Sequence, residues 1–161
     1  MPDLNEAHLS YTRLARILQT KREQGQKVVF TNGCFDILHF GHVSYLEEAK
    51  DCGDVLIVGL NSDASVKRLK GETRPINGEL ERAFVLCGLK SVDFVVIFDQ
   101  DTPYDLIKLI TPQVLVKGGD WKPEQIVGSE HVLNHGGEVK SLLFQAGFSS
   151  TKVIDKMNKE K

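Results

Sequence analysis

The stretch Thr31-Asn32-Gly33-Cys34-Phe35-Asp36-Ile37-Leu38-His39-Phe40-Gly41-His42 decides the fold of this 161-residue chain. It follows an apolar, strand-like run over residues 27–30 and precedes a helical pattern over residues 43–50. Two glycines and two histidines therefore occupy a strand-to-helix turn. In an α/β fold such a turn presents backbone N–H groups and the positive end of a helix dipole to an anion. The stretch predicts a binding site for a nucleotide phosphate.

Strand-like and helix-like segments alternate along the chain. Strands are predicted at residues 28–31, 55–60, 93–98, 114–116 and 138–144. Helical segments are predicted at residues 8–24, 43–50, 79–89, 102–111, 124–136 and 149–159. The alternation implies one α/β domain over residues 1–161, with a leading helix (1–25) and a core (26–157). We expect that core to be a single Rossmann-like, doubly wound parallel sheet.

Three of the helices carry more specific expectations. Ser10 or Thr12 is the predicted N-cap of the leading helix. Asn77 is the candidate cap of the 79–89 helix, and Thr102 is the predicted N-cap of the next helix, with Pro103 as its first residue. Four side chains of the 79–89 helix are expected to face inward: Leu80, Phe84, Val85 and Leu89.

Composition indicates an ordinary globular protein. Twenty basic and 22 acidic residues give a net charge of −2, so no nucleic-acid-binding surface is expected. The three cysteines, Cys34, Cys52 and Cys87, have no C-x-x-C spacing, which favours reduced thiols in a cytoplasmic protein. No signal peptide is evident, and no apolar run approaches the roughly 18 residues of a membrane span.

Polar or glycine-rich stretches follow four of the predicted strands. They cover residues 31–42, 61–63, 117–122 and 145–151. Ligands of open parallel sheets bind beyond the carboxyl ends of the strands, near the switch in strand order. These stretches are therefore the expected walls of a site.

His39 and His42 are spaced to lie on one face at the start of a helix. Gly41 between them lets a phosphate approach the backbone, and imidazole N–H groups can stabilise charge on a phosphate in transfer. Two structural or surface histidines would show the same spacing. A zinc site would require further ligands, and none is suitably spaced.

The chain resembles the cytidylyltransferase-like nucleotidyltransferases. Residues 33–42, G-C-F-D-I-L-H-F-G-H, are similar to the H-x-G-H signature of that family, to which class I aminoacyl-tRNA synthetases are related. Ser149-Ser150-Thr151-Lys152 resembles the second signature, with Phe148 in place of the usual isoleucine. The two motifs bracket nearly the whole domain in the family's order.

Two further segments resemble the heptose 1-phosphate adenylyltransferases of ADP-heptose synthesis. They are residues 61–77, N-S-D-A-S-V-K-R-L-K-G-E-T-R-P-I-N, and residues 115–121, L-V-K-G-G-D-W. The similarity covers roughly residues 25–157. It implies transfer of AMP from ATP to D-glycero-β-D-manno-heptose 1-phosphate, with release of pyrophosphate. Many such domains are fused to a sugar kinase; this chain is too short for one, which suggests the stand-alone form.

The resemblance also implies roles for individual residues. The expected catalytic residues are His39, His42 and Lys70. The expected nucleotide-binding residues are Gly33, Cys34, Phe35, Gly41, Arg82, Lys117, Gly118, Ser149, Ser150 and Thr151. The expected acceptor-binding residues are Asp36, Asn61, Asp63, Lys67, Asp120 and Trp121.

Several of these assignments have plainer alternatives. Asp36 could only cap a turn, and Arg82 could be an exposed helix arginine. The cluster of Lys67, Arg68 and Lys70 could be a solvated face, and Trp121 could only fill a hydrophobic edge. Among the three hydroxyl residues at 149–151, a simple N-cap requires only one.

The expected mechanism is direct attack of a sugar-phosphate oxygen on the α-phosphorus of ATP. Catalysis then consists of positioning and charge stabilisation, with Mg²⁺ held mainly by ATP and no protein side chain as its ligand. One alternative is a cytidylyltransferase acting on glycerol 3-phosphate or a related phospho-alcohol. Another is a nucleotide-binding module without turnover. A tRNA synthetase fragment is not favoured, and relatives of this fold imply a homodimer.

Overall fold

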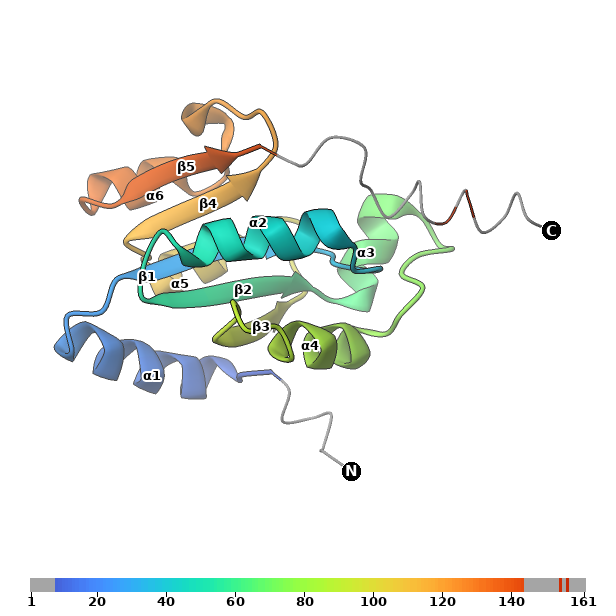
Figure 1. Cartoon of the computed structure of the whole chain (residues 1–161), viewed down its shortest axis with the longest axis horizontal. Helices are drawn as coiled ribbons and strands as arrows, with labels where there is room; N and C mark the ends of the chain where they lie inside the picture. The colour runs from blue at the N-terminus through green and yellow to red at the C-terminus, as the bar shows by residue number, and fades with distance from the viewer. Residues whose placement is uncertain (1–7, 144–153, 155, 157–161) are drawn as a thin grey trace.

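A five-stranded parallel sheet forms the centre of the molecule (Figure 1). The structure is a computed structural model that describes residues 8–143, 154 and 156. The strands are β1 (Val28–Gly33), β2 (Val55–Asn61), β3 (Phe94–Phe98), β4 (Val114–Gly118) and β5 (Glu138–Leu142). Their order is β3-β2-β1-β4-β5, and every neighbouring pair is parallel. The predicted doubly wound α/β class is confirmed.

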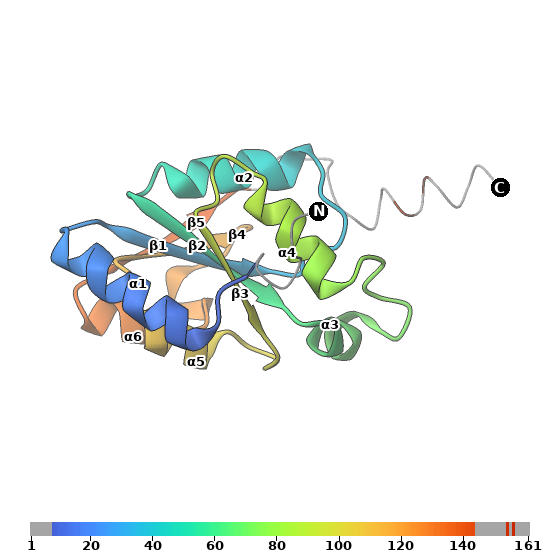
Figure 2. The same ribbon diagram turned by 90° about the horizontal axis from the view of Figure 1, so that it is seen from below.

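Helices cover both faces of the sheet. They are α1 (Tyr11–Glu23), α2 (Phe40–Lys50), α3 (Asp63–Lys70), α4 (Glu79–Cys87), α5 (Tyr104–Ile110) and α6 (Ser129–Asn134), with a short 3-10 helix η2 (Pro123–Gln125). Figure 2 shows α1, α5 and α6 on one face of the sheet and α2 and α4 on the other. Within the described part of the chain, no helix has the length and apolar character needed to cross a membrane.

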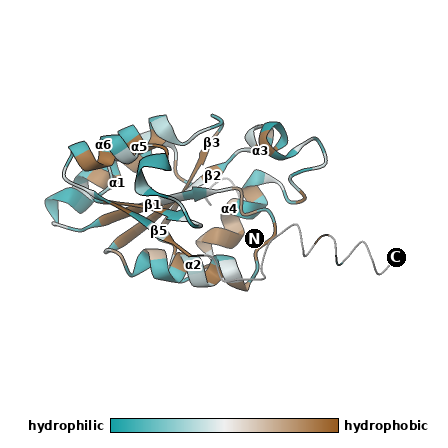
Figure 3. Cartoon of the chain, turned by 90° about the horizontal axis from the view of Figure 1, so that it is seen from above, coloured by the Kyte–Doolittle hydropathy of each residue, from teal (hydrophilic) through white to brown (hydrophobic). Residues whose placement is uncertain are grey.

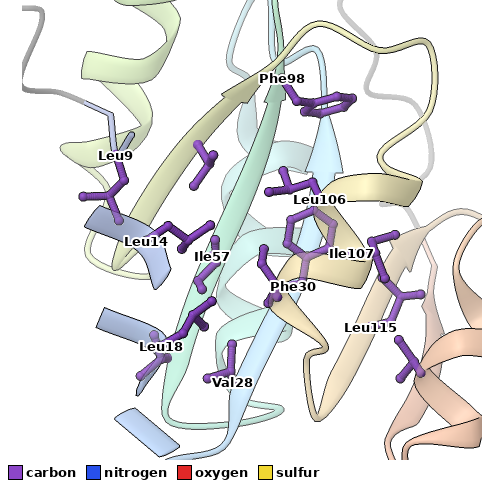
Figure 4. Packing of buried hydrophobic residues seen from close by; sticks show 14 of the residues in the cluster. Leu9, Leu14, Leu18, Val28, Phe30, Ile57, Phe98, Leu106, Ile107 and Leu115 are labelled. Carbon is purple, nitrogen blue, oxygen red and sulfur yellow. The ribbon is translucent and has the colours of Figure 1, made fainter. Parts of the chain in front are cut away.

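The core consists of one apolar layer on each face of the sheet. β1 alternates between them: Val28 and Phe30 join the layer beneath α1 and α5, whereas Val29 joins the layer beneath α2 and α4. Figure 4 shows Phe30, Ile57 and Leu106 packed together in the first layer. In Figure 3 the strands are largely hydrophobic, and the helices carry hydrophilic residues as well. Burial on both faces explains the continuous apolar runs of the strands.

The leading helix α1 follows its sequence signals. Ser10 is the N-cap, and its Oγ accepts a hydrogen bond from the backbone N–H of Arg13 at 3.3 Å. Leu14 and Leu18 are buried against the sheet. At the other end of the helix, the Arg22 guanidinium donates to the carbonyl oxygen of Ile110, at the end of α5.

Three local predictions are wrong. The N-cap of α4 is Gly78, because the Asn77 side chain instead donates to the backbone carbonyl of Asp36 at 2.7 Å. Phe84 and Val85 are exposed, whereas Arg82, Ala83 and Leu86 are the buried residues of α4. The following helix α5 begins one residue later than predicted, with Pro103 as its N-cap.

The predicted helix over residues 149–159 lies outside the described residues, apart from residues 154 and 156, which are helical.

The central strands β1 and β4 pair over a short distance only. Val29 pairs with Val114 and Phe30 pairs with Leu115, after which the register ends. β1 continues beside β2 as far as Gly33, and β4 continues beside β5 as far as Gly118. From β1 the chain continues to β2 on one side of the sheet, and from β4 it continues to β5 on the other side. The gap between the carboxyl ends of β1 and β4 is therefore the switch point where ligands bind in such sheets.

Candidate functional site

Two adjoining cavities lie at the carboxyl ends of β1 and β4. The His42 cavity has a volume of about 290 Å³ and includes Phe35, His42, Tyr45, Lys70 and Gly118 in its lining. The Asn61 cavity has a volume of about 330 Å³ and is lined by Asn61, Leu69, Asp101, Thr102, Pro103, Gln125, Ile126 and Val127, among others. Residues that line both cavities are Asn32, Gly33, Cys34, Lys117 and Trp121. The two cavities therefore share a wall.

The two histidines of the opening stretch lie together at the start of α2. His39 is the N-cap and His42 is in the first turn. Their rings are stacked, with centroids 3.8 Å apart and planes inclined by 19°. The Phe35 ring meets His42 edge-on at 5.2 Å. The prediction that both histidines share one helix face is confirmed.

His42 is poorly solvated. Burial lowers its pKa, as do its neighbours His39 and Lys70, to about 4, although a hydrogen bond with the Ile37 backbone opposes the shift. Burial also lowers the pKa of His39. At neutral pH the His42 ring is consequently uncharged and has a single N–H, which donates to the Ile37 carbonyl, so a second donor for a ligand requires protonation of the ring.

Two lysines supply positive charge. Lys117 lies in the wall shared by the cavities, and its Nζ donates to Oδ1 of Asn32 at 3.3 Å. Burial lowers the pKa of Lys117, and the neighbouring Cys34 opposes the shift. Lys70, the last residue of α3, lines the His42 cavity. A phosphate in the His42 cavity would meet both of these lysines in the lining.

The turn after β1 has a constrained backbone. Phe35 has a φ of 44°, in the left-handed region that is uncommon for a non-glycine residue. A Cβ on Gly33 would lie 2.8 Å from the Phe35 ring, so a side chain at this position would force the ring to move. This packing places the Phe35 ring between the strand end and His42.

Asp36 holds a loop and lines neither of the two cavities. Its carboxylate is fully buried and accepts from Nε of Arg74 at 2.6 Å and from the backbone N–H groups of Ile76 and Asn77. Burial by itself would raise the pKa of Asp36, but these hydrogen bonds and the charge of Arg74 lower it. The turn-organising alternative therefore explains Asp36 better than direct substrate binding.

Arg82 is a buried connection between segments and not an exposed helix residue. It is 3% exposed. Its guanidinium donates to the carbonyl oxygens of Cys34 at 2.6 Å, Asn61 at 2.9 Å and Asn77 at 3.0 Å, and to Asp63 Oδ1 at 2.7 Å. The guanidinium thus fixes the ends of β1 and β2, and contact of Arg82 with the nucleotide remains a prediction.

Only some of the expected acceptor-binding residues line the two cavities. Asn61 lines its cavity and donates to Oγ of Ser65 at 3.0 Å. Trp121 lines both cavities, and its Nε1 donates to the carbonyl oxygen of Gly118 at 3.1 Å. The Asp63 carboxylate forms an ion pair with Arg82, and neither Lys67 nor Asp120 lines either cavity. Ser149, Ser150 and Thr151 lie outside the described residues.

Several lining residues were absent from the predictions. Asn32 is part of the opening stretch, and Tyr45 comes about one helical turn after His42. Leu69 lies within the quoted segment 61–77, whereas Asp101, Thr102 and Gln125 come from loops and helix ends outside the quoted motifs. The sequence therefore held a signal for Asn32, Tyr45 and Leu69.

The fold and the paired cavities define a class of nucleotide-binding α/β proteins, and the comparisons specify the class. The profile of the family described as Cytidylyltransferase-like matches residues 30–156. The chain belongs to this family and is a nucleotidyltransferase.

Curated relatives are considerably longer than this chain. Bifunctional protein HldE of Geotalea uraniireducens is 54% identical over 156 residues, which is 97% of this chain and 32% of that protein. Bifunctional protein HldE of Wolinella succinogenes is 57% identical over 152 residues, 94% of this chain and 31% of that protein. The chain thus spans about a third of the length of these relatives.

Solved structures share the fold. The lipopolysaccharide core biosynthesis protein from Thermoplasma volcanium has a TM-score of 0.60 and 30% identity, over 75% of this chain and 98% of that one. Pantoate-beta-alanine ligase from Francisella tularensis, solved with an ATP analogue and beta-alanine, has a TM-score of 0.59 over 93% of this chain and 75% of that one. Its identity is 18%, so this likeness concerns the fold alone.

Proposed function

We propose that this chain transfers AMP from ATP to D-glycero-β-D-manno-heptose 1-phosphate, producing ADP-heptose and pyrophosphate for lipopolysaccharide core or another heptose-containing surface glycan. The observation that carries the proposal is the pair of cavities on either side of Lys117. One has His42 and the two lysines that suit a triphosphate, and the other has the side chains that suit a sugar. The similarity to HldE agrees with this choice of acceptor.

The His42 cavity suits the triphosphate. The N-terminus of α2 directs its dipole toward this region, and His42, Lys70 and Lys117 offer N–H donors from three different elements. A neutral His42 becomes a better proton binder when an anion enters, because the anion favours the charged imidazolium. The ring can therefore respond to the negative charge that builds up on the transferring phosphate.

The Asn61 cavity suits a polyol. Asn32, Asn61 and Gln125 provide amide groups, Thr102 a hydroxyl and Asp101 a carboxylate, all of which hydrogen-bond to sugar hydroxyls. Trp121 provides an apolar ring at the same edge, where it can pack against a sugar face. Lys117, in the shared wall, is the cation within reach of an acceptor phosphate.

The reaction requires no covalent intermediate. An oxygen of the acceptor phosphate attacks the α-phosphorus of ATP in line, the bond from that phosphorus to the bridging oxygen breaks, and pyrophosphate leaves. The protein aligns the two substrates and supplies N–H donors to the phosphate oxygens.

Mg²⁺ accompanies ATP in this proposal. Among the described residues no cluster of three or more His, Cys, Asp or Glu side chains could hold a metal ion. The nearby carboxylates are already engaged, Asp36 by Arg74, Asp63 by Arg82 and Asp101 by Arg68. Mg²⁺ commonly binds through substrate phosphates and water, so it would neutralise part of the triphosphate charge without a protein cage.

Mass spectrometry of the products tests the proposal directly. ATP, CTP, GTP and UTP should each be incubated with heptose 1-phosphate and with glycerol 3-phosphate in the presence of Mg²⁺. ADP-heptose and pyrophosphate are expected from ATP and heptose 1-phosphate. CDP-glycerol from the CTP reaction would replace the proposal with a cytidylyltransferase, and ATP binding without product from any acceptor would favour a non-catalytic module.

We further propose a cytoplasmic homodimer. Consumption of ATP requires the compartment where ATP is made, and Phe84 and Val85 on α4 are apolar side chains left exposed by the monomer. Multi-angle light scattering should give twice the 18.0 kDa mass of one chain, and Phe84→Glu should reduce it. A monomeric mass at micromolar concentration would contradict the dimer.

A further inference from the structure

The separation of β1 from β4 leaves a gap beneath the His42 cavity. Pairing between the two strands ends at Phe30 and Leu115. The residues that shape the cavity wall, Asn32 and Lys117, lie beyond that point, on strands held only by their outer neighbours. Sheet pairing alone therefore does not fix the width of the cleft.

Tyr45 connects the two strands across this gap. Its hydroxyl lies 2.5 Å from Oγ1 of Thr31 in β1 and also hydrogen-bonds to the backbone of Gly118 in β4. Thr31 is fully buried, and Tyr45 is 4% exposed. Both hydrogen bonds are therefore shielded from water, and Tyr45 lines the His42 cavity above them.

Parallel pairing explains the direction of the Gly118 bond. The next amide, that of Gly119, donates to the carbonyl oxygen of Leu142 at 2.8 Å on the β5 side. Successive amides of a strand point to opposite neighbours, so the N–H of Gly118 points toward the side that β1 has left. The phenolic oxygen can accept from this N–H, and either hydroxyl of the Tyr45–Thr31 pair can donate to the other.

We propose that Tyr45 is a positioning residue whose hydroxyl fixes the separation of β1 and β4 and so places Asn32 and Lys117 around a bound nucleotide phosphate. Asn32 directly follows Thr31, and Lys117 directly precedes Gly118. The hydrogen bond from Lys117 to Asn32 crosses the same cleft at 3.3 Å. The inference rests on the nucleotide site of the proposed function and adds to it a residue whose hydroxyl acts through β1 and β4.

Two substitutions remove the connection with little change of shape. Tyr45→Phe removes the hydroxyl and keeps the ring, and Thr31→Val removes the partner hydroxyl. Isothermal titration with Mg·ATP should show about a tenfold loss of affinity in each variant, the factor that corresponds to one ordinary hydrogen bond. The double variant should bind no more weakly than Tyr45→Phe alone, because both changes remove the same connection. Tyr104→Phe, on the exposed side of α5, is the matched control and should bind as the wild type does.

Other outcomes overturn the inference. Unchanged ATP affinity in a folded Tyr45→Phe protein with a lowered midpoint of thermal unfolding would make Tyr45 a structural residue only. Losses that multiply in the double variant would show that the two hydroxyls act separately. The titration contains no acceptor, so a wild type that binds ATP but yields no ADP-heptose defeats the proposed reaction and leaves the test of Tyr45 intact. A wild type that does not bind ATP overturns both.

Discussion

The ring of His42 lies face to face with the ring of His39, at 3.8 Å between centroids, on the first turn of α2. Two protonated imidazoles in this arrangement would repel each other, and burial makes the charge on His42 costlier still. The site therefore holds an uncharged ring beside the side chains of Lys70 and Lys117. An entering polyphosphate supplies the negative charge that this arrangement lacks.

Loss of the His42 ring should reduce turnover much more than it reduces folding. His42→Ala is expected to lower kcat by about tenfold to a thousandfold, the range for removal of one donor to a transition state. Steady-state release of pyrophosphate measures the effect, with His135→Ala at the exposed C-cap of α6 as the control. Near-normal turnover in a folded His42→Ala protein would remove His42 from the catalytic residues.

The depressed pKa of His42 also predicts a pH dependence of stability. Between pH 6.5 and about 4, the unfolded chain protonates His42 and the folded chain does not, so the unfolded state binds more protons. The free energy of unfolding should therefore fall as the pH is lowered through this interval. Urea unfolding between pH 7 and pH 4 should show a shallower decline in His42→Gln than in the wild type. Parallel curves for the two proteins would refute this contribution.

Replacement of Arg82 should destabilise the protein and loosen the site together. Arg82→Lys keeps one charge but cannot reach four acceptors, so buried carbonyl groups of Cys34, Asn61 and Asn77 lose their donors. The expected loss is about 3 kcal/mol of unfolding free energy, as for other broken buried networks. Chemical denaturation measures it, and Arg13→Lys on exposed α1 is the control. A loss below about 0.5 kcal/mol, the usual size for surface substitutions, would contradict the network.

Cys34 is expected to be a bystander that reports on occupancy of the site. Its Sγ is 3.9 Å from Oδ1 of Asn61, whereas its structural bond to Arg82 uses the backbone carbonyl. Cys34→Ser should thus retain most of the wild-type activity. N-ethylmaleimide should inactivate the wild type and Cys87→Ser but not Cys34→Ser, and ATP should slow the inactivation. Complete loss of activity in Cys34→Ser would give the thiol a part in the reaction.

Local pattern was sufficient to predict the architecture. The apolar runs in β1 and β2 are buried on both faces of the sheet, which explains why they lack the alternation of a half-exposed strand. The glycines and histidines of residues 33–42 likewise predicted the strand-to-helix turn, because the turn is made by neighbours in sequence. Both histidines lie where their spacing placed them.

Long-range polar contacts explain the two features of α4 that the sequence did not predict, its N-cap and its buried face. Asn77 is a good helix cap by type, yet Asp36, 41 residues away, engages both its amide group and its backbone N–H. Arg82 is normally a surface residue type, yet acceptors from three other segments bury it and turn Phe84 and Val85 outward. Neither outcome has a local pattern, because each depends on where distant segments meet.

The hydrogen bond between Lys117 and Asn32 joins residues that are 85 positions apart. β1 reaches the centre of the sheet early in the chain, but its partner β4 follows only after two other strands and four helices. Closing so large a loop is slow, because the chain loses conformational entropy before the new contact contributes favourable free energy. A folding intermediate in which β1, β2 and β3 are paired would therefore have an unfinished cleft. The ability to bind nucleotide would then appear late, which makes ATP binding a kinetic marker for the docking of β4.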